Sequence, residues 1–429
     1  MKRQIATYKV ENIIILKQQM LSWANQFNIC CLLDNNNYQS SYDSYECLVA
    51  VGAKSTYTTL QETNEFNGFK EFVANNNDWL FGHIAYDFKN HLFPIQSNNI
   101  NSLSFPDVFL FQPEIVVTIT KSFVTIESLT ISPEKVFDTI LSTSIVWPEN
   151  NTSSINVQPR IKKEEYIAII NKLKNHLQQG DCYEINFCQE FFAENVSINP
   201  LNVYSKLNAI SPTPFSAFYK LNNQYLLCAS PERFIKKNGD KIISQPIKGT
   251  AKRDLTNKTK DEQLKQQLIN SQKEKSENVM IVDLVRNDLS KIATRNSVQV
   301  DELFGIYSFA QVHQMISTVS ATIQDETSFA DILKALFPMG SMTGAPKYKV
   351  MQLIEEYEST KRGIYSGSVG YITPQNDFDF NVVIRSIMYD EQTKYVSYQV
   401  GGAITHYSNA ADEYEECLLK AKAMEKALQ

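Results

Sequence analysis

The chain has 429 residues, of which 43% are hydrophobic and 21% are charged, the balance of an ordinary soluble globular protein. This length is sufficient for two or three domains, or for one large composite domain. The formal net charge is −6, which argues against a general nucleic-acid-binding protein, because such proteins carry a basic face. A local cationic pocket for a small anionic substrate is still compatible with an acidic protein.

The cysteines and the apolar segments predict a cytoplasmic protein that does not associate with a membrane. No apolar run of signal-peptide length follows residues 1–5. No stretch approaches the roughly 18 apolar residues of a membrane helix. The seven cysteines form no Cys-x-x-Cys pair and no Cys/His cluster of the zinc type, so we expect free thiols in a reducing compartment.

The N-terminal part of the chain has the pattern of mixed strands and short helices. Apolar runs predict strands at residues 30–34, 79–87, 105–111 and 114–120. His83 and His91 have no partner pattern, so structural roles are favoured for both. Residues 148–159 are polar and rich in Asn and Ser, which is typical of a linker. We therefore divide the chain into an N-terminal region, 1–147, and a second region, 160–429.

The second region begins with a helix and continues with short strands. The helix is predicted over residues 164–179, and Gly180 is placed to end it. Residues 182–188 alternate as a strand, and Asn222-Asn223 forms the turn between two further strands. Helices follow, and strands then return. Because this order lacks a regular β-α-β rhythm, we predict an α+β fold rather than a doubly wound sheet.

The segment Gln-Pro-Ile-Lys-Gly-Thr-Ala-Lys-Arg, centred on Lys248, follows a short predicted strand. Gly249 permits close approach of a ligand to the backbone, and Thr250 adds a hydroxyl and an N–H group for an anion. The positive charges of Lys252 and Arg253 are expected to lower the pKa of Lys248 and favour a neutral, nucleophilic amine. The alternative is a surface lysine in a turn, which is the commoner situation for a single Lys.

Glu232 lies in the sequence Ser-Pro-Glu-Arg-Phe at the end of another predicted strand. The Asn-Gly pair at 238–239 is a strong hairpin signal, and the hairpin would bring Glu232 close to Lys248. A carboxyl group beside a reactive amine is suited to protonating a leaving group. The alternative is a surface ion pair of Glu232 with Arg233 or Lys236, and spacing alone does not decide between the two.

Two predicted helices carry further candidate carboxylates. On the helix at 274–288, positions +3, +4, +7 and +8 from Glu277 are apolar, so Glu277 heads the buried stripe. An inward carboxylate is costly unless it is paired or metal-bound, and the alternative is exposure in the first turn. On the helix at 412–428, Glu416 and Lys420 lie one turn apart beside an apolar stripe. Such a pair is also common as an ordinary helix ion pair worth ~0.3–0.5 kcal/mol.

Three other features have weaker chemical signals. His313 precedes an alternating strand, and a single His is more often structural. The turn-rich loop at 337–347 opens a helix whose free N–H groups suit an anion or a polarised oxygen. Arg385 ends an apolar run, so we expect it to be half-buried and to need an anionic partner such as a carboxylate.

The sequence Pro-Ile-Lys-Gly-Thr around Lys248 resembles the signature of the aminodeoxychorismate synthase component I family, within the chorismate-utilising enzymes. Anthranilate synthase relatives usually carry Ala at this position. The segments around Glu232, Glu277 and Glu416 are also similar to motifs of the family. The resemblance is specific over residues 160–425 and weak before them. It implies a chorismate-utilising-enzyme fold of the α+β class, in which mixed antiparallel sheets form a sandwich flanked by helices.

The resemblance also implies a role for each matching residue. Lys248 would be a covalent nucleophile, Glu232 the general acid–base, and His313 a catalytic group near the C4 hydroxyl that leaves. Mg²⁺ would be held by Glu277 and Glu416. The implied substrate-binding positions are Gly249, Thr250, Thr343, Tyr365, Arg385, Gly401, Gly402, Ala403 and Lys420.

Within that set, Tyr365 and Arg385 would bind the enolpyruvyl carboxylate, and Lys420 with the backbone of 401–403 would bind the ring carboxylate. The chain departs from the family at 32–35, where Leu-Leu-Asp-Asn replaces the tryptophan-sensing Leu-Leu-Glu-Ser, so feedback regulation is not predicted. Smaller departures are Met339 and Ala403, where the family usually has Gly.

The implied activity is that of a transferase that converts chorismate and ammonia to 4-amino-4-deoxychorismate for p-aminobenzoate and folate biosynthesis. The chain has no Gly-x-Cys-x-Gly amidotransferase motif, so a separate glutamine amidotransferase subunit would supply the ammonia. Anthranilate synthase component I is the nearest alternative, and Lys248 argues against it. An isochorismate-forming relative needs a water-activating lysine near position 184, where this chain has Glu184. A catalytically inactive ligand-sensing paralogue is the third alternative.

Overall fold

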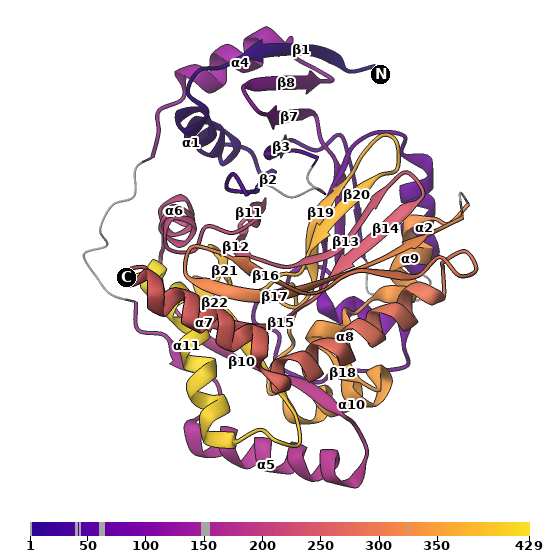
Figure 1. Ribbon diagram of the computed structural model, residues 1–429. Coiled ribbons are helices and arrows are strands. Elements are labelled where there is room, and N and C mark those ends of the chain that lie inside the picture. Colours follow the sequence, from indigo (N-terminus) through magenta and orange to yellow (C-terminus); the bar gives the residue numbers. More distant parts are fainter. Residues whose placement is uncertain (1, 39–41, 43, 60–64, 147–154, 325) are drawn as a thin grey trace.

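The computed structural model describes the chain except for residues 1, 39–41, 43, 60–64, 147–154 and 325. Two large antiparallel sheets form its framework, and helices cover their outer sides (Figure 1). The strands that border the candidate site, β10 and β22 in one sheet and β15 in the other, come together in the lower half of the view. The predicted α+β class and sandwich architecture are therefore confirmed.

The first sheet runs from the N-terminal strands to the strands of the candidate site. Its order is β1 (Gln4–Lys9), β8 (Phe123–Ser128), β7 (Ile115–Thr120), β3 (Cys47–Val51), β2 (Ile29–Asp34), β11 (Phe215–Leu221), β12 (Gln224–Ser230), β21 (Ser386–Asp390), β22 (Tyr395–Ile404), β10 (Glu184–Ala193) and β18 (Gly344–Ala345), with β9 (Gln158–Pro159) beside β10.

The second sheet lies to the right of the first in Figure 1. Its order is β15 (Ile247–Lys252), β17 (Val312–Thr322), β14 (Lys241–Gln245), β13 (Arg233–Asn238), β20 (Phe378–Asn381), β19 (Ser368–Ile372), β5 (Leu80–Ile84), β6 (Val108–Gln112) and β4 (Ser55–Thr58), with β16 (Gln299–Ser308) also paired to β17.

Helices complete three hydrophobic clusters around these sheets. The outer face of the first sheet packs against α1 (Ile13–Ala24), α4 (Pro133–Ser142), α6 (Pro200–Ile210) and α11 (Ala410–Leu428). The second sheet packs against α2 (Glu65–Asn75), α8 (Gln272–Ser290) and α9 (Phe329–Leu336), with α7 (Lys258–Asn270) beside β15. The third cluster joins β10 to α5 (Lys163–Gln179) and α10 (Lys347–Tyr357). The single-turn α3 (Lys89–Leu92) packs Leu92 against the cluster of the second sheet.

The two faces of the first sheet serve different cores because side chains alternate along a strand. On β2, Cys30 and Leu32 lie in the cluster under the helices of the outer face. Cys31, between them, lies in the cluster that contains residues of both sheets. A near-continuous apolar strand therefore indicates burial on both sides.

Local signals in the sequence are confirmed closely. Gly180 ends α5 with a φ of 82°, in the left-handed region that ends many helices. Asn222, with a φ of 56°, lies in the turn between β11 and β12. The predicted strand at 182–188 begins two residues later, at Glu184. All seven cysteines are buried and free, as expected.

The division of the chain at 148–159 does not correspond to a division between the sheets. Both sheets contain strands from before and after this segment, and β2 pairs directly with β11. The linker prediction falls largely on residues 147–154, which lie outside the described residues. None of the helices in the described part of the chain has the length and apolar character needed to traverse a bilayer.

A buried ion pair holds β10 in place behind the candidate site. The guanidinium of Arg362 donates to both oxygens of Glu358, at 2.6 and 2.9 Å, and to the carbonyl oxygen of Asn186 at 2.7 Å. Glu358 also accepts from the N–H of Cys188. Arg362 is 2% exposed and Glu358 is 4% exposed, so removal of either partner would leave a buried charge unpaired.

We therefore predict that Arg362→Met lowers the free energy of unfolding by about 3–5 kcal/mol, the cost of an uncompensated buried charge. Arg286→Met is the matched control, because Arg286 and Asp283 form an exposed pair that should contribute less than about 1 kcal/mol. Urea denaturation of both variants measures the difference. Equal stability of the two variants would contradict a structural role for the buried pair.

Candidate active site

Lys248 lies on β15, the edge strand of the second sheet, at an irregularity in the pairing with β17. The register shifts between Ile247 and Thr250, so the backbone bulges around Lys248 and Gly249. Gly249 has a φ of 95°, and a Cβ there would come within 3.1 Å of a carboxylate oxygen of Glu274. A glycine is therefore needed at this position for its conformation and for close packing against α8.

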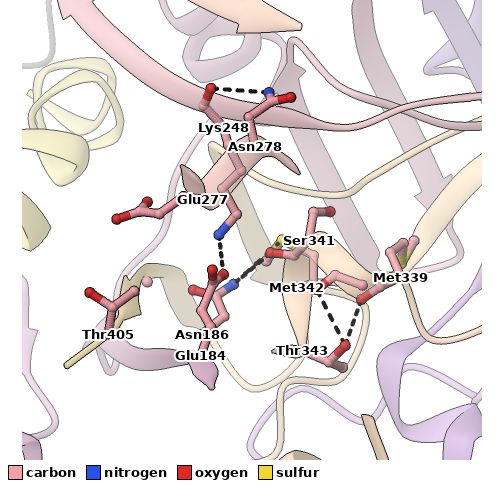
Figure 2. A network of polar contacts seen from close by, with 12 residues as sticks. Glu184, Asn186, Lys248, Glu277, Asn278, Met339, Ser341, Met342, Thr343 and Thr405 are labelled. Carbon is pink, nitrogen blue, oxygen red and sulfur yellow. Dashed lines mark hydrogen bonds and ion pairs between the residues drawn. The ribbon is translucent and has the colours of Figure 1, made fainter. Parts of the chain in front are cut away.

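The amine of Lys248 contacts a carboxylate of the other sheet. Figure 2 shows the side chain extending toward Glu184 at the start of β10, with Nζ 2.5 Å from Oε1. The Lys248 side chain is 10% exposed and that of Glu184 is 1% exposed. The second carboxylate oxygen, Oε2 of Glu184, is buried and has no hydrogen-bond partner among the described residues. A buried ion pair thus joins the two sheets at the site.

The expectation of a neutral Lys248 amine is wrong for the free protein. Burial lowers the pKa of Lys248, but the carboxylates of Glu184, Glu277 and Glu232 outweigh it, and the pKa is held above its ordinary value. The expected repulsion fails because Arg253 forms its own ion pair with Asp261 at 2.8 Å. Lysine at 248 is therefore charged at rest and not poised as a free amine.

Glu232 lies between β12 and β13 and is 5% exposed. The predicted hairpin of β13 and β14 is present, and Glu232 and Lys248 are close enough for each to influence the pKa of the other. Burial raises the pKa of Glu232 to about 7, although a 2.6 Å hydrogen bond from Ser341 Oγ opposes the rise. Arg233 instead pairs with Asp379. Glu232 can therefore carry a proton near neutral pH and donate it.

The helices α8 and α11 bring two pairs of glutamates together. Burial raises the pKa of Glu277 to about 7, with Lys248 opposing the rise and other carboxylates adding to it. The pKa values of Glu274 and Glu413 are raised as well, by burial first and with Glu416 contributing to both. The pKa of Glu416 is lowered, because Lys420 lies 2.8 Å away.

Glu274 and Glu413 were not among the predicted site residues. Each lies three residues before a predicted ligand, so both helices carry a Glu-x-x-Glu pair on one face. This repeated Glu-x-x-Glu spacing is the sequence pattern that could have predicted Glu274 and Glu413 as site residues. The described residues contain no group of three or more His, Cys, Asp or Glu side chains already arranged as a metal centre. A set of four carboxyl groups, three of which have raised pKa values, nevertheless suits a hard divalent cation, which would neutralise their charge.

Arg385 is a half-buried cation at the site. It has a φ of 50°, and its guanidinium makes no hydrogen bond or ion pair with the described residues. Burial lowers its pKa, and nearby Glu232 opposes this. Tyr365 is 3% exposed, with its hydroxyl 3.8 Å from the sulfur of Cys188. The Arg385 guanidinium can thus donate hydrogen bonds to both oxygens of a bound carboxylate.

The glycines of β22 lie where that strand has an open edge. β21 pairs with β22 only as far as Tyr398, and residues 401–403 pair with β10 alone. A Cβ on Gly401 would be 2.3 Å from the sulfur of Cys188, and one on Gly402 would be 3.3 Å from a carboxylate oxygen of Glu413. Lys420 donates to the carbonyl oxygen of Gly401 at 2.9 Å. A side chain at 401 or 402 would therefore press against Cys188 or Glu413, so glycine suits both positions.

Three predicted residues have other surroundings than expected. The hydroxyl of Thr343 donates to the carbonyl oxygen of Met339 at 2.9 Å within its own loop (Figure 2). Thr250 is exposed, on the strand after the bulge. The ring nitrogens of His313 contact Ser308 at 2.8 Å and Asp261 at 3.1 Å, so both are occupied by the protein.

The residue after His313 was missed by the sequence reasoning. Gln314 is 3% exposed, pairs across the ladder with Thr250, and leaves its Oε1 without a partner among the described residues. Because strand side chains alternate, Gln314 lies on the face opposite to His313. The alternation around His313 was the available signal, because it places Gln314 on the opposite face of the strand from His313.

Comparison with known proteins places this geometry in a family. The family model for chorismate binding enzymes matches residues 27–426, well beyond the region of specific resemblance. An anthranilate synthase component I-like protein of Synechocystis is 32% identical over 86% of this chain and 76% of the relative. Aminodeoxychorismate synthase component 1 of Salmonella typhimurium is 39% identical over 60% of this chain and 56% of the relative, and that of Bacillus subtilis is 35% identical over 62% and 56%. The matches to these two component 1 proteins thus span little more than half of their length.

Solved structures show the same fold at lower identity. Anthranilate synthase component I from Streptococcus pneumoniae has a TM-score of 0.79 and 23% identity, over 90% of this chain and 93% of that chain. The isochorismate synthase MenF of Escherichia coli has a TM-score of 0.74 and 16% identity, over 100% and 95%. The match over nearly the whole length shows that this chain belongs to the family of chorismate-binding enzymes.

Proposed function

We propose that this chain is an aminodeoxychorismate synthase component 1, which replaces the C4 hydroxyl of chorismate with the amino group of ammonia. The observation that carries the proposal is the buried amine of Lys248, which is paired with Glu184 and lies near enough to Glu232 to lower the pKa of that carboxyl group. The relatives of 35–39% identity that are named aminodeoxychorismate synthase component 1 support it. The resemblance at Pro-Ile-Lys-Gly-Thr, where anthranilate synthases usually have Ala, supports the same assignment.

The charges of the site match the two carboxylates of chorismate. The guanidinium of Arg385, together with Tyr365, would bind the enolpyruvyl carboxylate. The open edge of β22 at 401–403, together with Lys420, would bind the ring carboxylate. This orientation would place the ring between Lys248 and Glu232. Gly249 would border the ring from the bulge of β15, and Thr250 would follow it on the strand.

In the reaction, the neutral amine of Lys248 attacks C2 of the ring while the double bonds shift and the C4–O bond breaks. Glu232 gives its proton to the departing hydroxyl, which leaves as water. Ammonia then adds at C4, the double bonds return, and the bond between C2 and Lys248 breaks with its electron pair on nitrogen. The excess proton on the new amino group passes to Glu232, which is thereby ready for the next cycle.

Magnesium would be held by Glu277 and Glu416, with Glu274 and Glu413 one turn away. When bound, the ion would supply charge neutralisation for the ring carboxylate. Without a cation, four glutamates would repel this carboxylate, which is the physical reason to expect a metal requirement. His313, with both nitrogens occupied, would act on the site only through its contacts with Asp261 and Ser308.

The name "component 1" of the relatives supports a second subunit for this chain as well. That subunit would be a glutamine amidotransferase that supplies ammonia, in a cytoplasmic complex serving p-aminobenzoate and folate synthesis. Anthranilate synthase component I remains the second candidate, because relatives of that name match a larger share of this chain, 82% in Aquifex aeolicus. The two candidates give different isomers from the same substrates.

Product analysis with chorismate, ammonium and Mg²⁺ should therefore yield 4-amino-4-deoxychorismate and no anthranilate. Intact-mass measurement should find a fraction of the protein carrying chorismate less water on Lys248. Lys248→Ala should lose at least 100-fold in kcat and form no adduct, whereas Lys252→Ala should behave as wild type. The proposal would be contradicted if the product were anthranilate. It would also be contradicted if Lys248→Ala were fully active and the wild type formed no adduct.

The acid role of Glu232 predicts a pH dependence. The acid must be protonated to act, and burial raises its pKa to about 7, so kcat/KM should be constant below that pH and fall as the pH rises through it. Ser341→Ala removes a hydrogen bond that favours the carboxylate, so the fall should move up by about one pH unit, corresponding to ~1.4 kcal/mol.

Ser276→Ala is the control for this shift, because Ser276 is exposed on α8 and donates only to its own helix. The profiles should be measured at saturating Mg²⁺, so that ionisation of the metal-binding glutamates does not contribute. If the pH profile of Ser341→Ala matched that of the wild type, a group other than Glu232 would control the fall of kcat/KM at high pH.

The metal assignment predicts which carboxylates control magnesium affinity. Glu277→Gln and Glu416→Gln should each raise the half-saturating Mg²⁺ concentration at least tenfold, both in activity and in calorimetric titration of the protein with Mg²⁺. Glu425→Gln, an exposed site on α11, should leave it unchanged. Chelation with EDTA should abolish turnover. Normal magnesium affinity in both site variants would place the ion elsewhere.

A further inference from the structure

The protonation state of Lys248 imposes a requirement on the proposed reaction. Only the neutral amine can attack carbon, because the ammonium form has no free electron pair. In the structure the amine is paired with Glu184, with Nζ and Oε1 2.5 Å apart. The two side chains are 10% and 1% exposed, so bulk water is poorly placed to remove the proton. The proton must therefore pass to a group within the site.

We propose that Glu184 is a catalytic base that removes the proton of Lys248 before the attack and returns it after the amine is expelled. This inference rests on the proposed function, because Glu184 has this task only if Lys248 is the nucleophile. The donor and the acceptor are already in hydrogen-bond contact, so the transfer needs no movement of heavy atoms.

Burial of the pair favours the transfer. Two ions in a site shielded from water each carry a desolvation penalty of several kcal/mol, and moving one proton converts the ion pair into two neutral groups. Oε2 of Glu184 has no partner among the described residues, so protonating this carboxylate breaks no second hydrogen bond. The contact that keeps Lys248 charged at rest can therefore also neutralise it once chorismate closes the site to water.

The other carboxyl groups near Lys248 are engaged differently. Glu232 accepts a hydrogen bond from Ser341 and must bring a proton to the reaction, so it cannot also begin by accepting one. Glu277 lies 3.9 Å from Lys273 and belongs to the carboxylate set of α8 and α11. Among the hydrogen bonds and ion pairs of the described residues, the Lys248 amine contacts the carboxylate of Glu184 alone.

The protons balance over one cycle. Lys248 ammonium and Glu184 carboxylate become amine and carboxylic acid, and the amine then forms its bond to C2 as Glu232 protonates the leaving hydroxyl. When ammonia adds at C4, the C2–N bond breaks and Lys248 leaves as a neutral amine. The acid form of Glu184 returns its proton to that amine, and Glu232 takes the proton from the new C4 amino group. Chorismate and ammonia thus give product and water.

Glu184→Gln tests the proposal because it keeps the size and the hydrogen bond but removes the base. Adduct formation on Lys248 is measured by rapid quench and intact mass, with chorismate and Mg²⁺ but without ammonia. We expect the rate of adduct formation to fall at least tenfold. Glu190→Gln is the matched control, a buried glutamate on the same strand whose carboxylate binds Arg160 and Tyr395, and its rate should equal that of wild type.

Two further variants keep the test decisive if Glu184→Gln folds poorly. Glu184→Asp retains a base and should recover part of the rate, and Glu184→Ala should be accelerated by added formate, which can occupy the space of the missing carboxylate. A wild-type rate in Glu184→Gln, or no formate effect in a folded Glu184→Ala, would overturn the role of Glu184 and leave the nucleophile in place. Absence of any adduct in wild type would overturn the proposed function itself.

Discussion

The ion pair between Lys248 and Glu184 is the contact on which the geometry of the site depends. It joins β15, at the edge of one sheet, to the first residue of β10 in the other. Both side chains are nearly excluded from solvent, so each charge is tolerated only because the other is present. The ion pair also depends on the position of Glu184 at the start of β10. Arg362 fixes this strand by donating a hydrogen bond to the carbonyl oxygen of Asn186. The fold therefore holds the amine of Lys248 by pairing it with a carboxylate of the other sheet.

An excess of acid surrounds this pair. Carboxyl groups outnumber cationic groups at the site, which contains Glu184, Glu232, Glu274, Glu277, Glu413 and Glu416 against Lys248, Lys273, Arg385 and Lys420. Burial and mutual repulsion raise the pKa of several of these acids, and of Glu232 and Glu277 to about 7. A site of this kind would bind a doubly negative substrate poorly unless a cation and a free guanidinium offset the repulsion.

Much of the fold can be predicted from local sequence patterns, whereas the ion pair between Lys248 and Glu184 cannot. Gly180 at the end of α5 and the Asn-Gly turn before β14 act through their own backbone preferences, so the sequence is sufficient to predict them. Lys248 and Glu184 are 64 residues apart and in different sheets, and no periodic pattern relates them. Their contact depends on β10 crossing to lie near β15, so the charge on Lys248 was mispredicted from its chain neighbours alone.

Glu184 and Glu232 carry the same carboxyl group and differ in the groups that they contact. Glu232 is buried beside a neutral hydroxyl, so burial dominates and its proton is retained to about pH 7. Glu184 instead faces the ammonium group of Lys248 directly, at 2.5 Å. In the proposed reaction, one glutamate therefore begins with a proton to give and the other accepts one, which is what an amine nucleophile and a hydroxyl leaving group would together require.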